Sequence, residues 1–263
     1  MDDAPLKLYT FTLSHYSEKI RWMLELEKIP FEEIPWTPFF HVLSAKRRGK
    51  ATTVPVLESG AESIQDSTRI LLWLEKERAP LSLVPRDPRE REAALAAEAR
   101  FDDVGFHVLR YIYSDALAQD ANVIRYWTLD ATPVQKRIIE RAYPAMRWIF
   151  RRRFRVNEAT KAKSRALIDG ALTWLEGQVT AERPYLVGDR LTVADVTAAS
   201  LLAPLAAPDE HPVYGTSRYR EGLASLMSGL EDRRAIHWVR ETYRRHRAEF
   251  ARDGAIRRAV NAP

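Results

Sequence analysis

The chain has 263 residues, of which 46% are hydrophobic and 29% are charged, so it is long enough and apolar enough to fold around a sizeable core. It contains no cysteine, which excludes disulfides, thiolate metal sites and any reaction in which the protein supplies the thiol. The net charge of +5 suits an anionic partner such as a small acid, a nucleic acid or a membrane surface. The acidic start, MDDAPLKLYT, and the absence of an apolar run of about 18 residues predict a cytoplasmic protein.

The first eighty residues alternate strand and helix patterns. Ile20, Met23 and Leu24 recur at helical spacing and predict a helix from residue 14 to residue 28. A second helix is expected to begin at Ser67, and the basic stretch from Lys46 to Lys50 is expected to be a loop. We expect strands at 6–11, 31–34, 54–57 and 62–64. The order is βαβ followed by ββα.

Prolines 80, 85 and 88 interrupt the periodicity and mark the best domain boundary. We therefore expect an α/β domain over residues 1–83 and an all-α domain over residues 89–263. Asp87 and Pro88 suit the cap and the first turn of the helix that follows. Helices are expected at 88–119, 132–154, 158–180, 192–203, 220–230 and 232–252.

Ser14 falls between the first strand and the first helix. Unpaired backbone N–H groups and the helix dipole favour a bound anion at such a position. A thiolate could be stabilised there, and in a chain without cysteine that thiol would belong to another molecule. A plain helix N-cap is the alternative role for Ser14.

The segment Ser14-His15-Tyr16-Ser17 resembles the active-site loop of the serine classes of the glutathione transferase family. It also overlays the Cys-Pro-Tyr-Cys motif of the related glutaredoxins, with serine at both cysteine positions. The resemblance implies a thioredoxin-like domain followed by a helical domain, glutathione as co-substrate, and Ser14 as the catalytic residue that hydrogen-bonds the glutathione sulfur. His15 stands where the family often has proline. Tyr9 is the rival catalytic residue, because other classes use a tyrosine near the end of this strand.

Two further motifs of the N-terminal domain carry the same resemblance. Val54-Pro55 is similar to the family's Val-Pro pair, which implies a cis peptide and a backbone contact from Val54 to the cysteinyl part of glutathione. Asp66-Ser67 is similar to the family's Glu-Ser pair, which implies contacts to the γ-glutamyl group, with Asp in place of the usual Glu or Gln. Lys50 lies where the family places a cation for the glycyl carboxylate.

The segment 184–195 closely matches the family's signature in its C-terminal domain. Thr192 and Asp195 have the spacing of a capping box at the start of a helix. The resemblance also makes a homodimer plausible. It implies that an electrophilic, mainly hydrophobic substrate lies between the Ser14 loop and the first long helix of the second domain. The candidate lining residues are Tyr16, Phe106, His107, Arg110 and Tyr113, and no metal site is expected.

Residues 134–165 contain eleven Lys and Arg but only two Glu. Met146, Ile149, Phe150 and Phe154 share one helical face there, and most arginines lie elsewhere, which indicates a packed helix with a solvated basic side. A contact with an anionic membrane or a nucleic acid is the other interpretation. This run also favours a second hypothesis for the whole protein, a non-catalytic binding or adaptor protein with the same fold.

Overall fold

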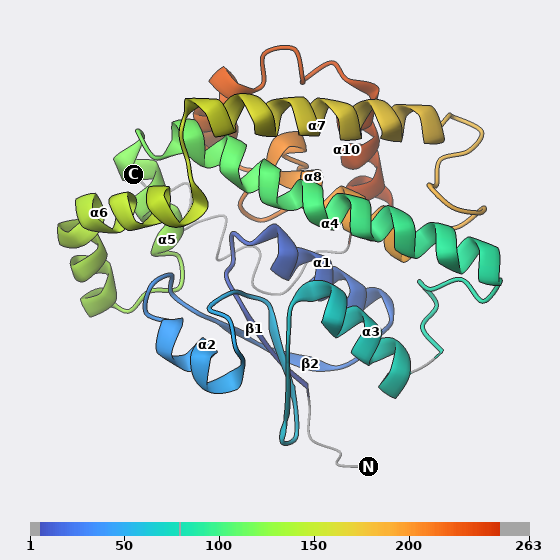
Figure 1. Ribbon diagram of the computed structural model, residues 1–263, viewed down its shortest axis with the longest axis horizontal. Coiled ribbons are helices and arrows are strands. Elements are labelled where there is room, and N and C mark those ends of the chain that lie inside the picture. Colours follow the sequence, from blue (N-terminus) through green and yellow to red (C-terminus); the bar gives the residue numbers. More distant parts are fainter. Residues whose placement is uncertain (1–5, 79, 248–263) are drawn as a thin grey trace.

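The computed structural model describes residues 6–78 and 80–247, which form an α/β sheet domain followed by a helical domain (Figure 1). The sheet order is β2-β1-β3-β4, with β1 and β2 parallel and the other pairs antiparallel. The elements of this domain are β1 (Leu6–Thr10), α1 (His15–Leu26), β2 (Phe31–Pro35), α2 (Val42–Arg48), β3 (Val56–Ser59), β4 (Glu62–Gln65) and α3 (Ser67–Arg78). The predicted fold class is confirmed.

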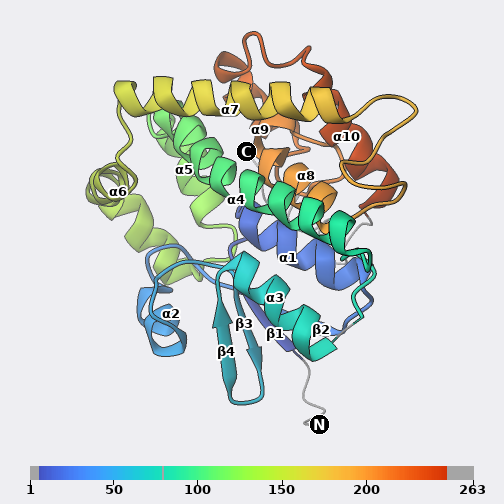
Figure 2. The same ribbon diagram turned by 45° about the vertical axis from the view of Figure 1, so that its right-hand side comes forward.

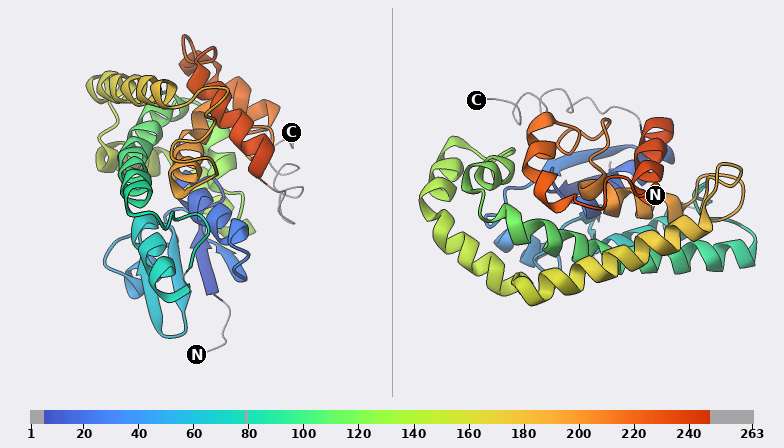
Figure 3. Two further views of the ribbon diagram at one scale, coloured as in Figure 1. Left: turned by 90° about the vertical axis from the view of Figure 1, so that its right-hand side faces the viewer. Right: turned by 90° about the horizontal axis from the view of Figure 1, so that it is seen from above.

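The helical domain is built around α8, whose residues are all buried. Helices α1, α4 and α10 pack against it, so α8 joins the sheet domain to the rest of the molecule (Figures 2 and 3). The elements are α4 (Pro88–Ala116), α5 (Asp120–Trp127), α6 (Pro133–Phe154), α7 (Glu158–Gln178), α8 (Val193–Ala206), α9 (Ser217–Leu223), the 3-10 helix η1 (Ala224–Leu226) and α10 (Arg234–His246).

Two short helices, α2 and α5, differ from the elements expected from the sequence. Residues 46–50 were expected in a loop, but α2 extends to Arg48 and buries Ala45, its only buried side chain. The eight-residue α5 was not expected, and it buries Val123 and Trp127. The helix expected at 220–230 is instead α9 followed by η1. Residues 248–252 of the last expected helix lie outside the described residues.

The predicted capping box at the start of α8 is confirmed. The Asp195 carboxylate accepts hydrogen bonds from the backbone N and the hydroxyl of Thr192, at 2.8 and 2.9 Å, and from the backbone N of Leu186 at 2.8 Å. Burial nevertheless raises the pKa of Asp195 to about 6.

Helix α6 packs less completely than its sequence indicates. Met146, Phe150 and Phe154 contact a second core cluster with Trp127, as expected from their shared face. Ile149 does not join them, because its position on the helix turns it toward solvent.

Within the described residues, no helix combines the length and hydropathy needed to cross a lipid bilayer.

Candidate active site

Three loops that carry predicted site residues leave the same edge of the sheet. In the strand register, Tyr9 near the end of β1 pairs with Val56 at the start of β3, and Val56 pairs with Gln65 at the end of β4. The segments that adjoin these strand ends are 11–14, 53–55 and 66–67. The topology therefore brings Ser14, the Val54-Pro55 pair and Ser67 to one edge.

Ser14 is the N-cap of α1. Its hydroxyl oxygen accepts a hydrogen bond from the backbone N of Ser17 at 3.2 Å, and its extended backbone begins the helix. This is the capping role, but it uses only a lone pair, so the hydroxyl can still donate its hydrogen to a second group. The N-terminal end of the α1 dipole adds positive potential at the same place.

The helical domain holds the loop that precedes Ser14. The Tyr214 hydroxyl donates to the carbonyl oxygen of Leu13 at 2.5 Å, and the Thr12 hydroxyl donates to the Asp130 carboxylate at 2.5 Å. Both partners come from residues far along the chain. The position of Ser14 therefore depends on packing between the domains as well as on α1 itself.

The first turn of α1 is fixed against α4 by two side chains. His15 Nε2 lies 2.9 Å from the carbonyl oxygen of Gly105, so this nitrogen carries the hydrogen and donates it. Burial lowers the pKa of His15 to about 4, so the ring is neutral near pH 7. The Tyr16 hydroxyl donates to the carbonyl oxygen of Asp102 at 2.6 Å. A side chain at Gly105 would meet Tyr16, because an added Cβ would lie 2.9 Å from its hydroxyl oxygen.

Ser67, the first residue of α3, belongs to a buried charged cluster. Its hydroxyl donates to Asp102 Oδ1 at 3.1 Å and accepts from Lys19 Nζ at 3.2 Å. The Lys19 ammonium, which is fully buried, also pairs with Glu98 at 2.5 Å and with Asp102 at 3.1 Å. The cluster therefore fixes the Ser67 hydroxyl between a cation and a carboxylate that also pair with each other.

The Val54–Pro55 peptide is cis, as predicted. Gln65 supports the loop before it: its side-chain amide exchanges two hydrogen bonds with the backbone of Ala51 and donates to the carbonyl of Thr53 at 2.9 Å. Next along the chain, Asp66 has a φ of 91°, a region that costs an L-residue free energy and is often retained at functional sites. Its carboxylate caps α3 by accepting from the backbone N of Arg69 at 3.1 Å.

Several cations lie near this edge. Lys50, the predicted one, is exposed, whereas Arg48 pairs with Glu58 at 2.7 Å. A third cation, which the sequence did not single out, is Arg153 of α6, whose guanidinium donates to the Thr52 hydroxyl at 3.2 Å. Beside it, His41 Nε2 donates to the Thr52 carbonyl at 3.0 Å, and burial lowers the pKa of His41. The dense basic run 134–165 includes Arg153, but nothing in the sequence indicated that this residue would contact Thr52 of the first domain.

A pocket of about 450 Å³ lies beside the first turn of α1. It is lined by Tyr16, Asp102, Asp103, Val104, Phe106, His107 and Leu167. Three of the five predicted substrate-site residues belong to this lining. Arg110 lies next to it, with its guanidinium over the Phe106 ring and its Nε donating to the Phe154 carbonyl at 2.9 Å.

The fifth predicted residue, Tyr113, lies in the second core cluster. Its ring stacks near Phe150, its hydroxyl accepts from Trp127 Nε1 at 2.9 Å, and burial raises its pKa to about 12. Among the described residues, no three His, Asp or Glu side chains are grouped in a way that could hold a metal ion.

Comparison with known families decides the classification. Residues 8–82 match the N-terminal domain of glutathione S-transferases, and residues 158–233 match their C-terminal domain. The chain belongs to the glutathione S-transferase family. The order of the two matches is the order of the two domains in the structure.

Individual relatives of this transferase-family chain are more distant. A maleylpyruvate isomerase from Ralstonia sp. is 34% identical over 97 residues, a match that spans 35% of this chain and only 46% of that protein. Among solved structures, a glutathione S-transferase from Methylobacillus flagellatus with GSH bound superposes with a TM-score of 0.59 at 15% identity, over 95% of this chain and 98% of the other. A β-etherase from Sphingobium sp. strain SYK-6 gives 0.59 at 21% identity, over 91% and 100%. These structural likenesses show the shared fold.

Tyr9, the rival to Ser14 in this transferase fold, is engaged elsewhere. Its hydroxyl donates to Glu58 Oε2 at 2.5 Å and accepts from Arg48 at 3.2 Å, and its ring stacks on Trp36. Burial and the Glu58 carboxylate raise its pKa. A phenol held in this way cannot donate its hydrogen to a thiolate without giving up Glu58.

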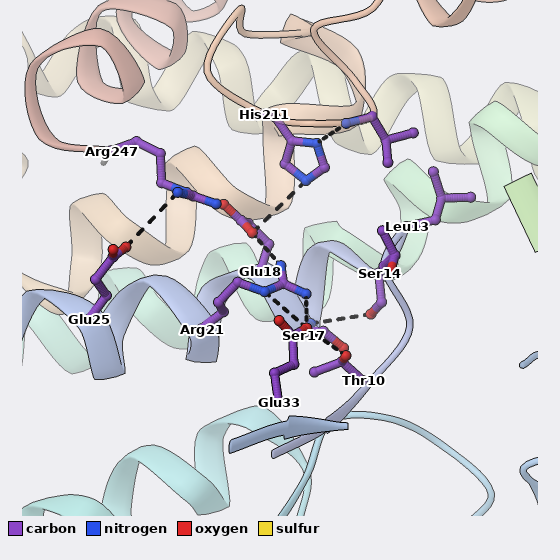
Figure 4. A network of polar contacts seen from close by, with 12 residues as sticks. Thr10, Leu13, Ser14, Ser17, Glu18, Arg21, Glu25, Glu33, His211 and Arg247 are labelled. Atoms are coloured by element: carbon purple, nitrogen blue, oxygen red, sulfur yellow. Dashed lines mark hydrogen bonds and ion pairs between the residues drawn. The ribbon is translucent and has the colours of Figure 1, made fainter. Parts of the chain in front are cut away.

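The transferase fold also buries an ion network on the far side of α1 (Figure 4). The Glu18 carboxylate accepts from Arg21 at 2.5 Å and from Arg247 Nε at 2.7 Å, and all three side chains are buried. Arg21 also pairs with Glu33 at 2.5 Å. His211 Nε2 lies 3.9 Å from the same Glu18 carboxylate. The network holds α1 from the side opposite the pocket, one turn after Ser14.

Proposed function

We propose that this protein is a glutathione-dependent enzyme in which Ser14 stabilises the glutathione thiolate. The observation that supports the proposal best is the position of the Ser14 hydroxyl, at the N-terminus of α1 and at the sheet edge that it shares with Val54 and Ser67. The family membership supports glutathione as the thiol, which the chain itself lacks.

Each part of glutathione has a candidate partner at this edge. The Ser14 hydroxyl donates to sulfur, and the backbone of Val54, before the cis Pro55, faces the cysteinyl part. The γ-glutamyl group, which carries both a carboxylate and an ammonium, fits beside Asp66 and Ser67. The buried Lys19 and Asp102 add opposite charges at the Ser67 hydroxyl. The glycyl carboxylate, an anion, would pair with Lys50 or Arg153.

The thiolate is the reactive species, and two contributions favour it at neutral pH. A hydrogen bond to a charged group contributes about 1.5 to 3 kcal/mol, which lowers a thiol pKa by roughly one to two units. The helix dipole of α1 acts in the same direction. His15, which is neutral because burial lowers its pKa, supplies no cation. The electrophile then lies in the pocket of Tyr16, Phe106 and His107.

The substrate class is proposed from the pocket lining. Tyr16, Phe106 and Leu167 offer apolar surface, while Asp102 and Asp103 place carboxylates there, so a neutral, mainly hydrophobic electrophile is favoured over an anionic one. Glutathione-dependent isomerisation of an unsaturated acid is the second candidate, because one relative is named a maleylpyruvate isomerase. Both reactions require the same thiolate.

The test replaces Ser14 with alanine. We expect the pKa of bound glutathione to rise by roughly one to two units and turnover of a generic aryl halide near pH 7 to fall at least about tenfold, with little change in glutathione affinity. The measurements are a pH titration of thiolate absorbance and steady-state kinetics, with maleylpyruvate as a parallel substrate.

Two serine variants control this experiment. Ser17→Ala removes a buried hydroxyl that forms no hydrogen bond within the described residues, so it should leave the thiol pKa unchanged. Ser67→Ala should weaken glutathione binding more than Ser17→Ala does, because only Ser67 lies at the proposed γ-glutamyl end. An unaltered thiol pKa and rate in Ser14→Ala would eliminate Ser14 and make Tyr9 the next residue to test.

The alternative is a non-catalytic binding or adaptor protein of the same fold. It is separated from the enzyme by two measurements, retention on a glutathione column and turnover of any thiol-transfer substrate. Retention without turnover would favour the adaptor.

We further propose a cytoplasmic homodimer, which sedimentation of the purified protein and fractionation of its native cells would check.

A further inference from the structure

Helix α6 has one packed face and one outward face. The packed face contributes Ile139, Tyr143, Phe150 and Phe154 to the second core cluster. The outward face is defined here as residues 134, 137, 138, 141, 145, 148 and 152. At about 100° per residue these positions fall within about 100° of one another, on the side opposite the packed face. The packed face of α6 is therefore apolar, and the outward face mixes apolar and basic side chains.

The outward face exposes large apolar side chains. Val134 is 64% exposed, Ile138 is 42% exposed and Trp148 is 61% exposed. Val134 and Ile138 lie one turn apart, and Trp148 lies farther along the same stripe of the helix. The neighbouring Ile149 is also turned to solvent.

The same face is basic. Arg137, Arg141 and Arg152 alternate with the apolar residues, and Glu140 is the one acidic residue of α6. Within residues 6–78 and 80–247, these three arginines form no ion pair, whereas Arg147 of the same helix pairs with Asp120. The Arg152 guanidinium lies 5.1 Å from the centre of the Trp148 ring, so its stem runs beside the indole.

A second exposed segment lies beside α6. Thr37 donates to Gln135 near the start of α6, and Arg153 near its end donates to Thr52, so both ends of segment 37–52 contact the helix. Helix α2, within this segment, lies below α6 in Figures 1 and 2. This segment includes α2, which exposes Val42 and Leu43 together with Lys46 and Arg47. It repeats the combination of apolar and basic side chains found on the outward face.

We propose that the outward face of α6 docks the protein on an anionic phospholipid surface, with Trp148 in the headgroup layer. Arginines near the surface attract anionic headgroups, and the amphipathic ring of an exposed tryptophan suits the headgroup layer. A second copy of this chain is disfavoured as the occupant, since it would oppose arginines to arginines. Nucleic acid is disfavoured because Val134 and Ile138 would meet phosphates.

The first experiment measures co-sedimentation of the full chain with vesicles in 50 mM salt. We expect binding to equimolar phosphatidylglycerol and phosphatidylcholine, little binding to phosphatidylcholine alone, and weakening as salt is raised. Three arginines near an anionic surface together raise the vesicle affinity roughly a hundredfold. The triple variant R137Q/R141Q/R152Q should therefore bind roughly a hundredfold more weakly. The matched control R86Q/R89Q/R183Q removes the same charge from other exposed positions and should lose far less.

The second experiment tests the depth of Trp148. Lipids with brominated acyl chains should quench part of the tryptophan fluorescence of the wild type, and W148F should lack that part while remaining folded by circular dichroism. Equal loss of binding in the two triple variants would overturn the proposal, because the attraction would then come from net charge alone. So would tight binding to a duplex DNA without binding to anionic vesicles, or a protein that ignores both vesicle types.

Discussion

Helices α1 and α6 both carry many charged residues, and the structure uses them in opposite ways. Glu18, Lys19 and Arg21 of α1 are buried and each is paired with an opposite charge. Arg137, Arg141 and Arg152 of α6 lie at the surface. A buried charge is destabilising unless its partner is present, whereas an exposed charge costs little whether or not it is paired. The same residue types therefore hold the candidate site in one helix and remain available for a partner in the other.

Removing one buried partner should have the largest effect. Arg247→Met leaves Glu18 with one guanidinium fewer inside the protein, and we expect a loss of about 3 to 5 kcal/mol in the free energy of unfolding. Arg244→Met, on the surface of α10, is the matched control and should cost far less, because solvent screens its pair with Glu241. Urea denaturation of the two variants measures the difference. Equal losses would mean that the network does not stabilise α1.

The pH dependence of stability should also come from α1. Burial lowers the pKa of His15 from 6.5 to about 4, so the folded protein keeps the ring neutral. The stability that comes from this is fully present above pH 6.5 and is lost as the pH falls toward 4. The loss is about 3 kcal/mol. Burial alone would raise the pKa of Glu18, but Arg247, His211 and Arg21 outweigh it and lower that pKa, so Glu18 adds to the decline below about pH 4.5.

The variant His15→Gln separates these two contributions. It should be less stable than the wild type at pH 7 and should show a flatter stability curve between pH 6.5 and pH 4. Denaturation curves at half-unit intervals of pH give both slopes. Parallel slopes in the two proteins would show that His15 is not neutral in the folded state.

The contact between α1 and α4 can be tested with two glycines. Gly105→Ala places a Cβ against Tyr16, so we expect destabilisation by about 1 to 3 kcal/mol and weaker substrate binding in the pocket. Gly170→Ala, in α7, has no atom within 4 Å of the added Cβ and should instead stabilise the protein by up to about 1 kcal/mol. Thermal unfolding of both variants gives the signs, and a neutral Gly105→Ala would contradict the close packing.

The smallest effect is expected on α6. Arg141→Gln changes an exposed side chain without an ion pair among the described residues, so stability should change by no more than about 0.5 kcal/mol. Chemical denaturation checks this value. A larger loss would show that the outward face is part of the folding core and would make the vesicle results harder to assign to docking.

Local sequence signals predicted much of the fold. The helix start at Ser14 and the Thr192–Asp195 box depend on neighbours within a few residues. The cis Val54–Pro55 bond was implied by the family resemblance and not by its neighbours alone. The short α2 and α5 gave no periodic signal long enough to recognise.

The remaining parts of the site depend on distant contacts. Arg247 reaches Glu18 across 229 positions, and Asp102 meets Ser67 from another helix. No pattern in a single sequence pairs such residues. Ile149 shows the limit even within one helix, since its membership of an apolar face did not decide whether that face was buried.

The contact between Glu18 and Arg247 also orders events during synthesis. A ribosome releases residue 18 long before it adds residue 247, so the emerging chain must carry the Glu18 carboxylate without this partner while most of the helical domain is made. A compact sheet domain that buried Glu18 during that interval would carry an undercompensated charge, which is strongly unfavourable. Glu18 therefore reaches its final environment only when Arg247 is present, which ties the packing of the first domain to the end of the second.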